Sequence, residues 1–267
     1  VIAGVRHGTG TLTSGGQDFI YEGDWCEGVR TGEGRCVING QDTYNGQWRD
    51  NKFHGQGQFS DADGNVYDGE WAVGLRHGMG KQQMCAGEEG EECEEYNGEW
   101  YQGHRHGIGT CAYPNKSVYS GNWANEKWSG EGTLVYSDGR RYEGQWANNR
   151  QHGCGNWTSG GGDRKEGQWK MGRPLDDVEW TIWYVNGSTY RGMCKGGRPH
   201  GQGTCKYANG DVYTGDWVDG QRSGQGICVF GGMQEGSIYS GDWEQDQIAL
   251  QGKGSLTLPD GTVHEYC

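Results

Sequence analysis

The sequence predicts an all-β fold, an elongated single-sheet antiparallel meander of consecutive hairpins that is curled and twisted. A Tyr-x-Gly-x-Trp motif recurs along nearly the whole chain, most often at an interval of 23 residues, and self-similarity at a fixed period is typical of repeat architectures. Glycine supplies 54 of the 267 residues and the apolar set only 32%, which is too little to fill one thick spherical core. Such arrays offer a long surface rather than one pocket, so the pattern favours binding over catalysis.

Each copy of the motif begins with an aromatic anchor. The intact anchors are Tyr21, Tyr44, Tyr67, Tyr96, Tyr119, Tyr142, Tyr190, Tyr213 and Tyr239. A weakened copy starts at Lys165, and Tyr266 opens a copy that the chain does not finish. We therefore expect about ten repeats, with partial units at both ends.

Residues 130–146 illustrate the elements expected in one repeat. Apolar or small residues alternate with polar ones up to Tyr136, as in a strand. Ser137-Asp138-Gly139 then predicts a turn, because glycine tolerates positive φ, and the motif from Tyr142 to Trp146 predicts the returning strand. A second turn is expected after each Trp, as at Arg49-Asp50-Asn51-Lys52.

The glycines of this hairpin predict its register. A three-residue loop places Leu134 opposite Tyr142 and Gly132 opposite Gly144, so that these residues share one face with Trp146. Glycine then leaves room for the large rings. A two-residue loop would break this register.

Two segments depart from the repeat. An insertion over residues 85–95 is expected to form a solvated acidic loop; it carries Glu88, Glu89, Glu91, Glu92, Glu94 and Glu95. Over residues 163–195 the repeat is weakest, because Lys165 replaces Tyr and Cys194 replaces Trp. We expect an N-terminal array over 1–162, a degenerate repeat with a bend over 163–195, and a C-terminal array over 196–267.

The extended pattern Tyr-x-Gly-x-Trp-x-x-Gly/Asn-x-x-x-Gly-x-Gly, which runs nearly complete from Tyr96 to Gly109, resembles the MORN (membrane occupation and recognition nexus) repeat. The resemblance covers nearly the whole chain. It implies a module that recruits, spaces or tethers, as in cytoskeletal scaffolds, the radial-spoke heads of cilia and junctional membrane tethers, while any chemistry lies in other domains. Fold alone does not identify the partner.

Charge and hydropathy exclude several classes of partner. A formal charge of −13 disfavours nucleic acid, which needs a dominant basic footprint. No apolar run approaches the roughly 20 residues of a membrane-spanning helix, and no signal peptide is visible. These features predict a cytoplasmic protein, associated with the cytoskeleton or a cilium.

The ten cysteines are expected to be structural rather than catalytic or metal-binding. Cys36, Cys111, Cys205 and Cys228 occupy an inward slot that holds Leu or Phe in other repeats, so we expect buried free thiols and a reducing compartment. Six of the eight histidines precede the same repeat glycine and are interpreted as structural. The nearest metal-like sets have unconvincing zinc spacing: Cys194, His200 and Cys205, or Cys93, His104 and His106. We predict no cofactor, metal or enzymatic activity.

A basic residue follows each Trp position by four or five residues. These residues are Arg30, Lys52, Arg76, Arg105, Lys127, Arg150, Arg173, Arg198 and Arg222, and we call them the basic edge. One interpretation is that they pair with acidic neighbours such as Glu22, Glu70, Glu99 and Glu143, in surface pairs that contribute little. The other is a track for an acidic protein segment or for phosphoinositide headgroups.

The preferred functional hypothesis is a non-catalytic scaffold that binds protein partners along an aromatic groove, because Tyr and Trp bury area at low entropic cost. The predicted groove residues are Tyr21, Trp25, Tyr44, Trp48, Tyr67, Trp71, Tyr96, Trp100, Tyr119, Trp123, Tyr142, Trp146, Tyr213, Trp217, Tyr239 and Trp243. The alternative is a peripheral membrane tether that uses the basic edge. Self-association through terminal strands is a further expectation.

Overall fold

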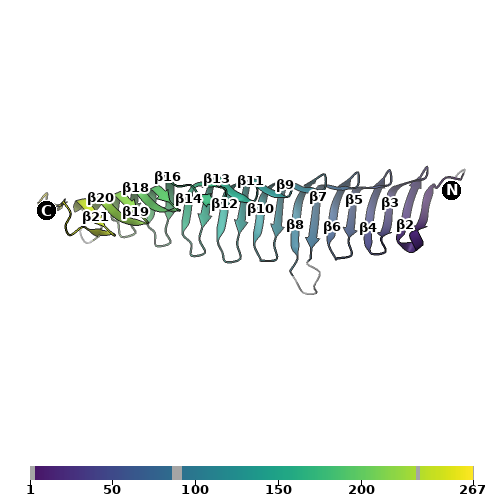
Figure 1. Ribbon diagram of the computed structural model, residues 1–267, viewed down its shortest axis with the longest axis horizontal. Coiled ribbons are helices and arrows are strands. Elements are labelled where there is room, and N and C mark those ends of the chain that lie inside the picture. Colours follow the sequence, from purple (N-terminus) through teal and green to yellow (C-terminus); the bar gives the residue numbers. More distant parts are fainter. Residues whose placement is uncertain (1–3, 86–91, 233–234, 267) are drawn as a thin grey trace. The chain divides into compact units, whose positions relative to one another are not determined.

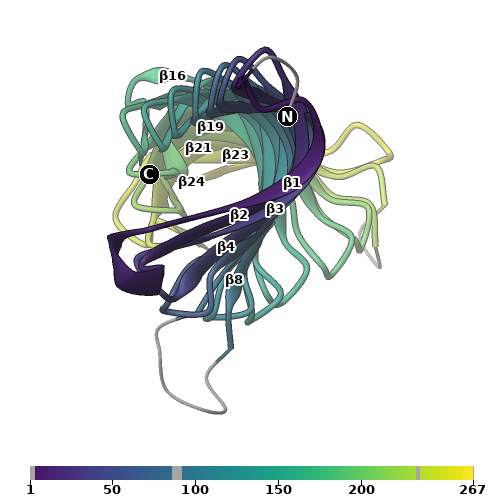
Figure 2. The same cartoon turned by 90° about the vertical axis from the view of Figure 1, so that its right-hand side faces the viewer.

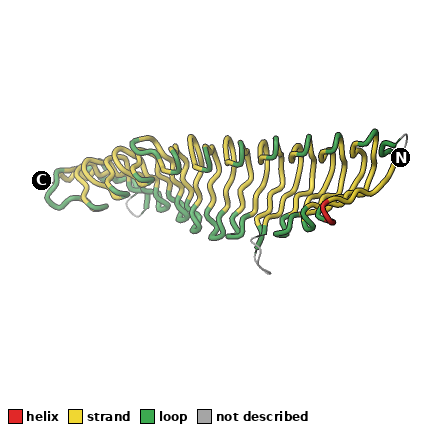
Figure 3. Tube along the Cα trace, turned by 45° about the vertical axis from the view of Figure 1, so that its right-hand side comes forward, coloured by secondary structure: helices red, strands yellow, loops and turns green. Residues whose placement is uncertain are grey.

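The computed structural model describes residues 4–85, 92–232 and 235–266, and strands dominate it (Figure 1). The predicted all-β antiparallel meander is confirmed, because in each of two compact units the strands pair antiparallel in chain order. Two interruptions occur in the second unit, where a two-residue strand and the longer strand after it both pair with the strand before them. Besides the strands there is a short 3₁₀ helix, η1 (Gly15–Gln17), drawn in red in Figure 3. Within the described residues, no helix has the length and apolar character needed to cross a bilayer.

The first unit runs from Val1 to Ser137, and its strands curve in one sense (Figure 2). Its strands are β1 (Gly8–Ser14), β2 (Phe19–Cys26), β3 (Val29–Ile38), β4 (Asp42–Arg49), β5 (Lys52–Ser60), β6 (Val66–Ala72), β7 (Leu75–Met84), β8 (Glu94–Tyr101), β9 (His104–Ala112), β10 (Val118–Ala124) and β11 (Lys127–Val135).

The second unit runs from Asp138 to Cys267. Its strands are β12 (Arg141–Ala147), β13 (Arg150–Thr158), β14 (Arg164–Lys170), β15 (Arg173–Pro174), β16 (Val178–Trp183), β17 (Thr189–Lys195), β18 (Arg198–Lys206), β19 (Val212–Val218), β20 (Gln221–Val229), β21 (Ile238–Glu244), β22 (Gln247–Ile248), β23 (Gly254–Thr257) and β24 (Val263–Tyr266). The boundary between the units falls inside the array expected over 1–162, and the bend expected over 163–195 stays a prediction.

The predicted register is found at the hairpins that follow each Gly-x-Gly. In β3 and β4, Cys36 lies opposite Tyr44, Gly34 opposite Gly46, and Gly32 opposite Trp48. The turns after each Trp are also where the sequence places them. Asp50 and Asn51 form a two-residue turn with φ values of 51° and 65°, as two-residue hairpin turns of this kind require.

A β-bulge in each repeat was not predicted. Between β4 and β5 the register shifts after Gly46, so that Trp48 lies opposite Phe53. The residue before each Trp compensates for the interrupted ladder, because its side chain reaches a backbone group that the bulge leaves unpaired. Gln47 Oε1 accepts from the Gln56 amide at 3.2 Å, and Glu70 Oε1 accepts from the Met79 amide at 2.9 Å.

One glycine per repeat strand lines up across the sheet, and we call this line the glycine row. A Cβ added to Gly46 would lie 2.3 Å from Cα of Gly57, its neighbour on β5. A Cβ added to Gly57 would lie 2.3 Å from the Tyr44 hydroxyl oxygen and 2.6 Å from the edge of its ring. The predicted role of glycine as room for the rings is confirmed, and backbone-to-backbone proximity is a second reason for it.

The rings over the glycine row form the core of each unit. Tyr21 contacts Trp25 of its own repeat and Trp48 of the next, edge to face, with centroids 5.2 and 5.0 Å apart, as aromatic pairs prefer. The indole N–H of the tryptophan and the hydroxyl of the tyrosine both donate hydrogen bonds to backbone carbonyls of the sheet. Trp48 Nε1 donates to the Gly34 carbonyl at 3.0 Å, and the Tyr21 hydroxyl donates to the Asp24 carbonyl at 2.9 Å.

In the degenerate repeat, a tryptophan at a position that usually holds glycine replaces the missing tyrosine ring. Trp180 of β16 takes the place in the glycine row where the pattern expects glycine, opposite Gly192. Its ring is 1% exposed and covers Gly167, where an added Cβ would meet it at 2.2 Å. Trp180 thus fills the volume that a tyrosine at position 165 would occupy. Lys165 instead extends its ammonium group to the Gly197 carbonyl at 2.7 Å.

Candidate functional site

Within each unit, the predicted groove residues lie together on one face of the sheet, which we call the ring face. The eight tyrosines are 0–2% exposed and the eight tryptophans 3–8% exposed. The tyrosine rings therefore hold the sheet together and have no surface left to offer a partner. The tryptophan rings expose only a small part of their surface to a partner. If a partner binds the ring face, the contacts must come mainly from the side chains that border these rings.

The residues of the basic edge fall into two sets that differ in direction and exposure, although the sequence analysis grouped them as one. Residues four positions after a Trp, or after the Cys194 that replaces one, are exposed at the hairpin tips: Lys52, Lys127, Arg150, Arg173 and Arg198. Residues five positions after a Trp turn inward over the rings, because successive side chains of a strand point to opposite faces: Arg30, Arg76, Arg105 and Arg222. The same inward position holds Phe53, which stacks on Tyr44 with centroids 3.7 Å apart.

The inward arginines make cation–π contacts with tryptophan. The guanidinium carbon lies 4.6 Å from the Trp48 ring centroid for Arg30, and 4.4 Å from the Trp100 centroid for Arg76. Arg105 and Arg222 make the same kind of contact, with Trp123 and Trp243. Such contacts are favourable where water is partly excluded.

Three of the four acidic partners suggested by the sequence, Glu70, Glu99 and Glu143, have other partners, and among the described residues Glu22 forms no ion pair with the basic edge. Glu70 and Glu99 accept backbone amides of Met79 and Ile108 at the bulges, both at 2.9 Å. Glu143 pairs with Arg141, which is not part of the basic edge. The carboxylates were misassigned because the bulge that recruits Glu70 and Glu99 was not foreseen.

The four inward arginines differ in what neutralises them. Arg105 is held by two carboxylates, Glu126 at 2.7 Å and Glu94 at 2.5 Å. Burial alone would lower the pKa of Arg105, but the hydrogen bonds and charges of these two carboxylates outweigh it and raise the pKa. Arg222 pairs with Asp246 at 3.3 Å. Glu94 lies two positions before Tyr96, whereas Glu126 and Asp246 lie at the hairpin tip of the following repeat.

Arg30 and Arg76 have neutral partners instead. Arg30 donates to the side-chain oxygen and the carbonyl oxygen of Asn51, both at 3.2 Å. Arg76 donates to the Gly103 carbonyl at 3.1 Å. Among the residues that the structure describes, neither has a carboxylate within salt-bridge distance, and burial lowers the pKa of both.

Two cavities open beside these two arginines. The first, of about 310 Å³, is lined by Phe19, Arg30, Ile38, Trp48, Asn51, Lys52, Phe53 and Gly74. The second, of about 390 Å³, is lined by Phe59, Asp61, Asn65, Val66, Tyr67, Trp71, Arg76, Gln82 and Met84. These cavities were not predicted. The Tyr-to-Arg spacing of nine residues marks the four inward arginines but does not distinguish the two that lie beside a cavity.

The four slot cysteines are buried as predicted. Cys36, Cys111, Cys205 and Cys228 are 0–3% exposed and carry free thiols. Burial raises the pKa of Cys36 and of Cys228 to about 11. Free Cys26 and Cys154 are exposed.

We expect the slot cysteines to resist alkylation at pH 8 in the folded protein, while Cys26 and Cys154 react within minutes. Because the folded-state pKa of the slot thiols is raised, their contribution to stability is fully present below the unfolded value of about 8.5 and is lost as pH rises towards 11. Iodoacetamide labelling with peptide mapping, and urea unfolding at pH 7.5 and 10, check both statements. Rapid labelling of Cys228 at pH 8 without denaturant would contradict them.

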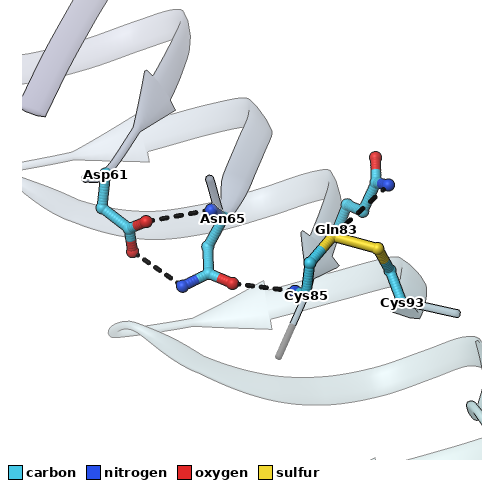
Figure 4. The surroundings of a disulfide bond; sticks show 5 residues. All are labelled: Asp61, Asn65, Gln83, Cys85 and Cys93. Carbon is cyan, nitrogen blue, oxygen red and sulfur yellow. Dashed lines mark hydrogen bonds between the residues drawn. A yellow bond between two sulfur atoms is a disulfide. The ribbon is translucent and has the colours of Figure 1, made fainter. Parts of the chain in front are cut away.

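A disulfide between Cys85 and Cys93 was not predicted (Figure 4). Its two cysteines flank part of the acidic insertion, whose residues 86–91 lie outside the described part of the chain. The Cys85 amide donates to the Asn65 side-chain oxygen at 3.0 Å, and Asn65 is fixed by Asp61. We expected a reducing compartment because the cysteines were predicted to be unpaired, and this disulfide removes that basis.

The metal-like sets of the sequence do not assemble. Cys93 is committed to the disulfide, and in the described ranges no three His, Cys, Asp or Glu side chains form a group that could hold a metal ion. His106 lies near the Tyr101 ring instead, with centroids 5.7 Å apart, and His77 is 5.6 Å from the same ring.

Comparison with known proteins gives a family and distant structural likenesses. The MORN repeat model matches residues 2–18, 21–43, 44–66, 67–87, 96–118, 119–140, 142–164, 190–212, 213–232 and 239–263. No curated protein matches the chain.

Three solved structures are similar at low identity. The SAS-4 (dCPAP) TCP domain of Drosophila melanogaster, in complex with a proline-rich motif of Ana2 (dSTIL), is 14% identical with a TM-score of 0.39, over 60% of this chain and 84% of that one. The TCP10 domain of Danio rerio CPAP, in complex with a peptide of STIL, is 10% identical with a TM-score of 0.40, over 79% and 93%. A streptogramin B lyase is 9% identical with a TM-score of 0.15, over 97% and 82%. These likenesses are too distant to support an argument about function.

Proposed function

Because the chain belongs to the MORN repeat family, we propose that it is a non-catalytic scaffold that binds protein partners along its ring face, within a cytoskeletal or ciliary assembly. The observation that carries this proposal is the pair of aromatic-bordered cavities beside Arg30 and Arg76. Apolar and aromatic side chains supply contact area there, and a few polar groups can fix orientation. The cytoskeletal or ciliary setting rests on family resemblance alone.

The test is partner capture from native cells with the full chain as bait. Ile38→Asp places a charge in the cavity beside Arg30, and we expect it to remove the specific partners seen by mass spectrometry. Val185→Asp is the matched control, because Val185 is 75% exposed and lines neither cavity. Circular dichroism melting verifies that both variants fold. Equal capture by both variants would refute binding at this face.

The second candidate is a peripheral membrane tether that binds acidic phospholipids. It is favoured by one observation, the exposed cations at three hairpin tips of the second unit, Arg150, Arg173 and Arg198. A net charge of −13 opposes it, since an anionic leaflet repels the rest of the chain. Sedimentation with phosphoinositide vesicles distinguishes the candidates. Binding that falls steeply with salt supports the tether, and no binding at low salt removes it.

A further inference from the structure

We propose that Arg30 and Arg76 are paired receptor sites for carboxylate side chains, and that the partner segment on this part of the ring face is an extended acidic peptide. This inference rests on the proposed function and names the chemistry of the partner. It follows from a comparison of four equivalent arginines in the same chain. Two of them have a carboxylate of the chain within salt-bridge distance, and in the described part of the chain the other two do not.

The four arginines occupy the same place in their repeats. Each lies nine residues after its Tyr, turns inward and contacts the Trp of the next repeat. Taking a guanidinium cation partly out of water is costly unless a carboxylate accompanies it. Arg105 and Arg222 have carboxylates from their own chain, whereas Arg30 and Arg76 have none within salt-bridge distance among the described residues.

The Arg105 site shows where a carboxylate binds on this framework. Glu94 lies two residues before Tyr96 and reaches Arg105 Nη1 at 2.5 Å. The equivalent residues in the other two repeats are Phe19 and Asn65, and both line the cavities beside Arg30 and Arg76. At these two sites the position of Glu94 therefore holds no carboxylate, and a cavity lies beside the residue that replaces it.

The cavities select a carboxylate attached to an apolar chain. Phe19, Ile38, Trp48 and Phe53 surround the first site, and the Arg30 guanidinium also lies 5.2 Å from the Phe19 ring. One carboxylate lines the second site, but Asp61 is already occupied. Its oxygens accept from the amides of Asp63 and Asn65 and from the Asn65 side chain at 2.9–3.0 Å.

The spacing of the two sites favours an extended segment. Arg30 is on β3 and Arg76 on β7, four strands apart, which corresponds to about 19 Å at the usual strand separation. An extended peptide rises about 3.4 Å per residue, so two acidic residues about six positions apart would reach both arginines. Anionic lipid is the less suitable occupant, because each cation is recessed among rings instead of lying at an exposed tip.

The experiment measures fluorescence anisotropy of a labelled peptide on the full chain. The probe is a Ser/Ala/Leu peptide with two glutamates six positions apart, and its twin has glutamine in both places. We expect the glutamate probe to bind about tenfold more tightly than the twin, since charge-assisted hydrogen bonds to guanidinium are lost in the twin, and to weaken as salt is raised. Equal affinity of probe and twin, or no binding of the probe up to about 1 mM, overturns the proposal.

Variants separate the arginine sites from general charge. Arg30→Gln and Arg76→Gln should each weaken the probe about tenfold. Arg49→Gln removes the same charge from an exposed tip on the same side and should change affinity less than twofold. Melting temperatures verify that all three remain folded. Equal losses in all three would mean that only net charge matters, and the proposal would be wrong.

A fourth variant copies the internal carboxylate. Phe19→Glu places a glutamate on the Arg30 site as Glu94 lies on Arg105, so it should weaken the probe about tenfold, whereas Phe19→Leu should change affinity less than threefold. If Phe19→Glu binds the probe normally, the proposal fails. If phosphoinositide vesicles bind through Arg30 and Arg76 and the peptide does not, the occupant is lipid. If the probe does not bind but the full chain still captures its cellular partners, the scaffold proposal stays and only this inference is wrong.

Discussion

Replacing Gly69 with alanine is expected to destabilise the first unit by about 3 kcal/mol or more, although it adds a single methyl group. The new Cβ would lie 2.4 Å from Cα of Gly80 and 2.5 Å from the Met79 carbonyl oxygen. Both obstacles are backbone atoms of the neighbouring strand, so no rotamer change relieves the overlap. Overpacking in well-packed cores costs about 1–3 kcal/mol when side chains can yield. Urea unfolding followed by tryptophan fluorescence measures the effect.

The glycine row supplies its own control for this prediction. Gly10 is the member of the row on β1, and a Cβ there would meet only the Trp25 ring at 3.7 Å, an ordinary contact. Gly10→Ala should therefore leave the free energy of unfolding within about 0.5 kcal/mol of the unchanged protein. Similar losses for Gly69→Ala and Gly10→Ala would mean that the backbone approach is not what fixes glycine in this row.

The second large effect concerns Lys165 and Trp180. Trp180→Gly should cost about 3–5 kcal/mol, because it leaves the ring volume above Gly167 empty. Lys165→Tyr alone should cost about 1–3 kcal/mol, since the new ring would compete with Trp180 for that volume. Together the two changes recreate the pattern of the other repeats, and the double variant should recover most of the loss.

A double-mutant cycle measures this coupling. We expect an interaction free energy of at least about 2 kcal/mol between positions 165 and 180, because each substitution supplies the volume change that the other one needs. Unfolding free energies of the four proteins in urea give the value. Additive effects would show that Trp180 does not stand in for the missing tyrosine.

The repeat architecture was predictable because its signals are local and repeated. The Tyr, Gly and Trp spacing fixed the hairpins, and the turn residues fixed the register found at Cys36 and Tyr44. The bulge after the row glycine was not predictable from alternation, since it inserts two residues into the second strand without any composition signal. The two-residue turn after each Trp decides which residue turns inward, because it pairs the Trp with the fifth residue after it, as Trp48 with Phe53 and Trp25 with Arg30. The sequence pattern did not separate the fourth residue from the fifth, and for this reason Lys52 and Arg30 were placed in one set.

The binding surface was harder to predict than the fold. Tyr and Trp are typical of interfaces and also of cores, and a sequence does not distinguish the two. Burial of Tyr44 at 0% and Trp48 at 5% resolves this for the rings. Whether an inward arginine is neutralised depends on residues such as Glu94 and Glu126, 11 and 21 positions away, which no local pattern connects.

The edge-to-face contact between a Trp and the Tyr of the repeat before it has a consequence for cutting the chain into fragments. Trp48 donates to Gly34 and packs on Tyr21 as well as on Tyr44, so the period seen in the sequence, from one Tyr to the next, is not the period of the packing. A fragment that starts at an anchoring Tyr leaves its first indole without an acceptor and half uncovered. Fragments for biophysical work should start one strand earlier, at the Gly-x-Gly strand, so that the first indole keeps its carbonyl partner.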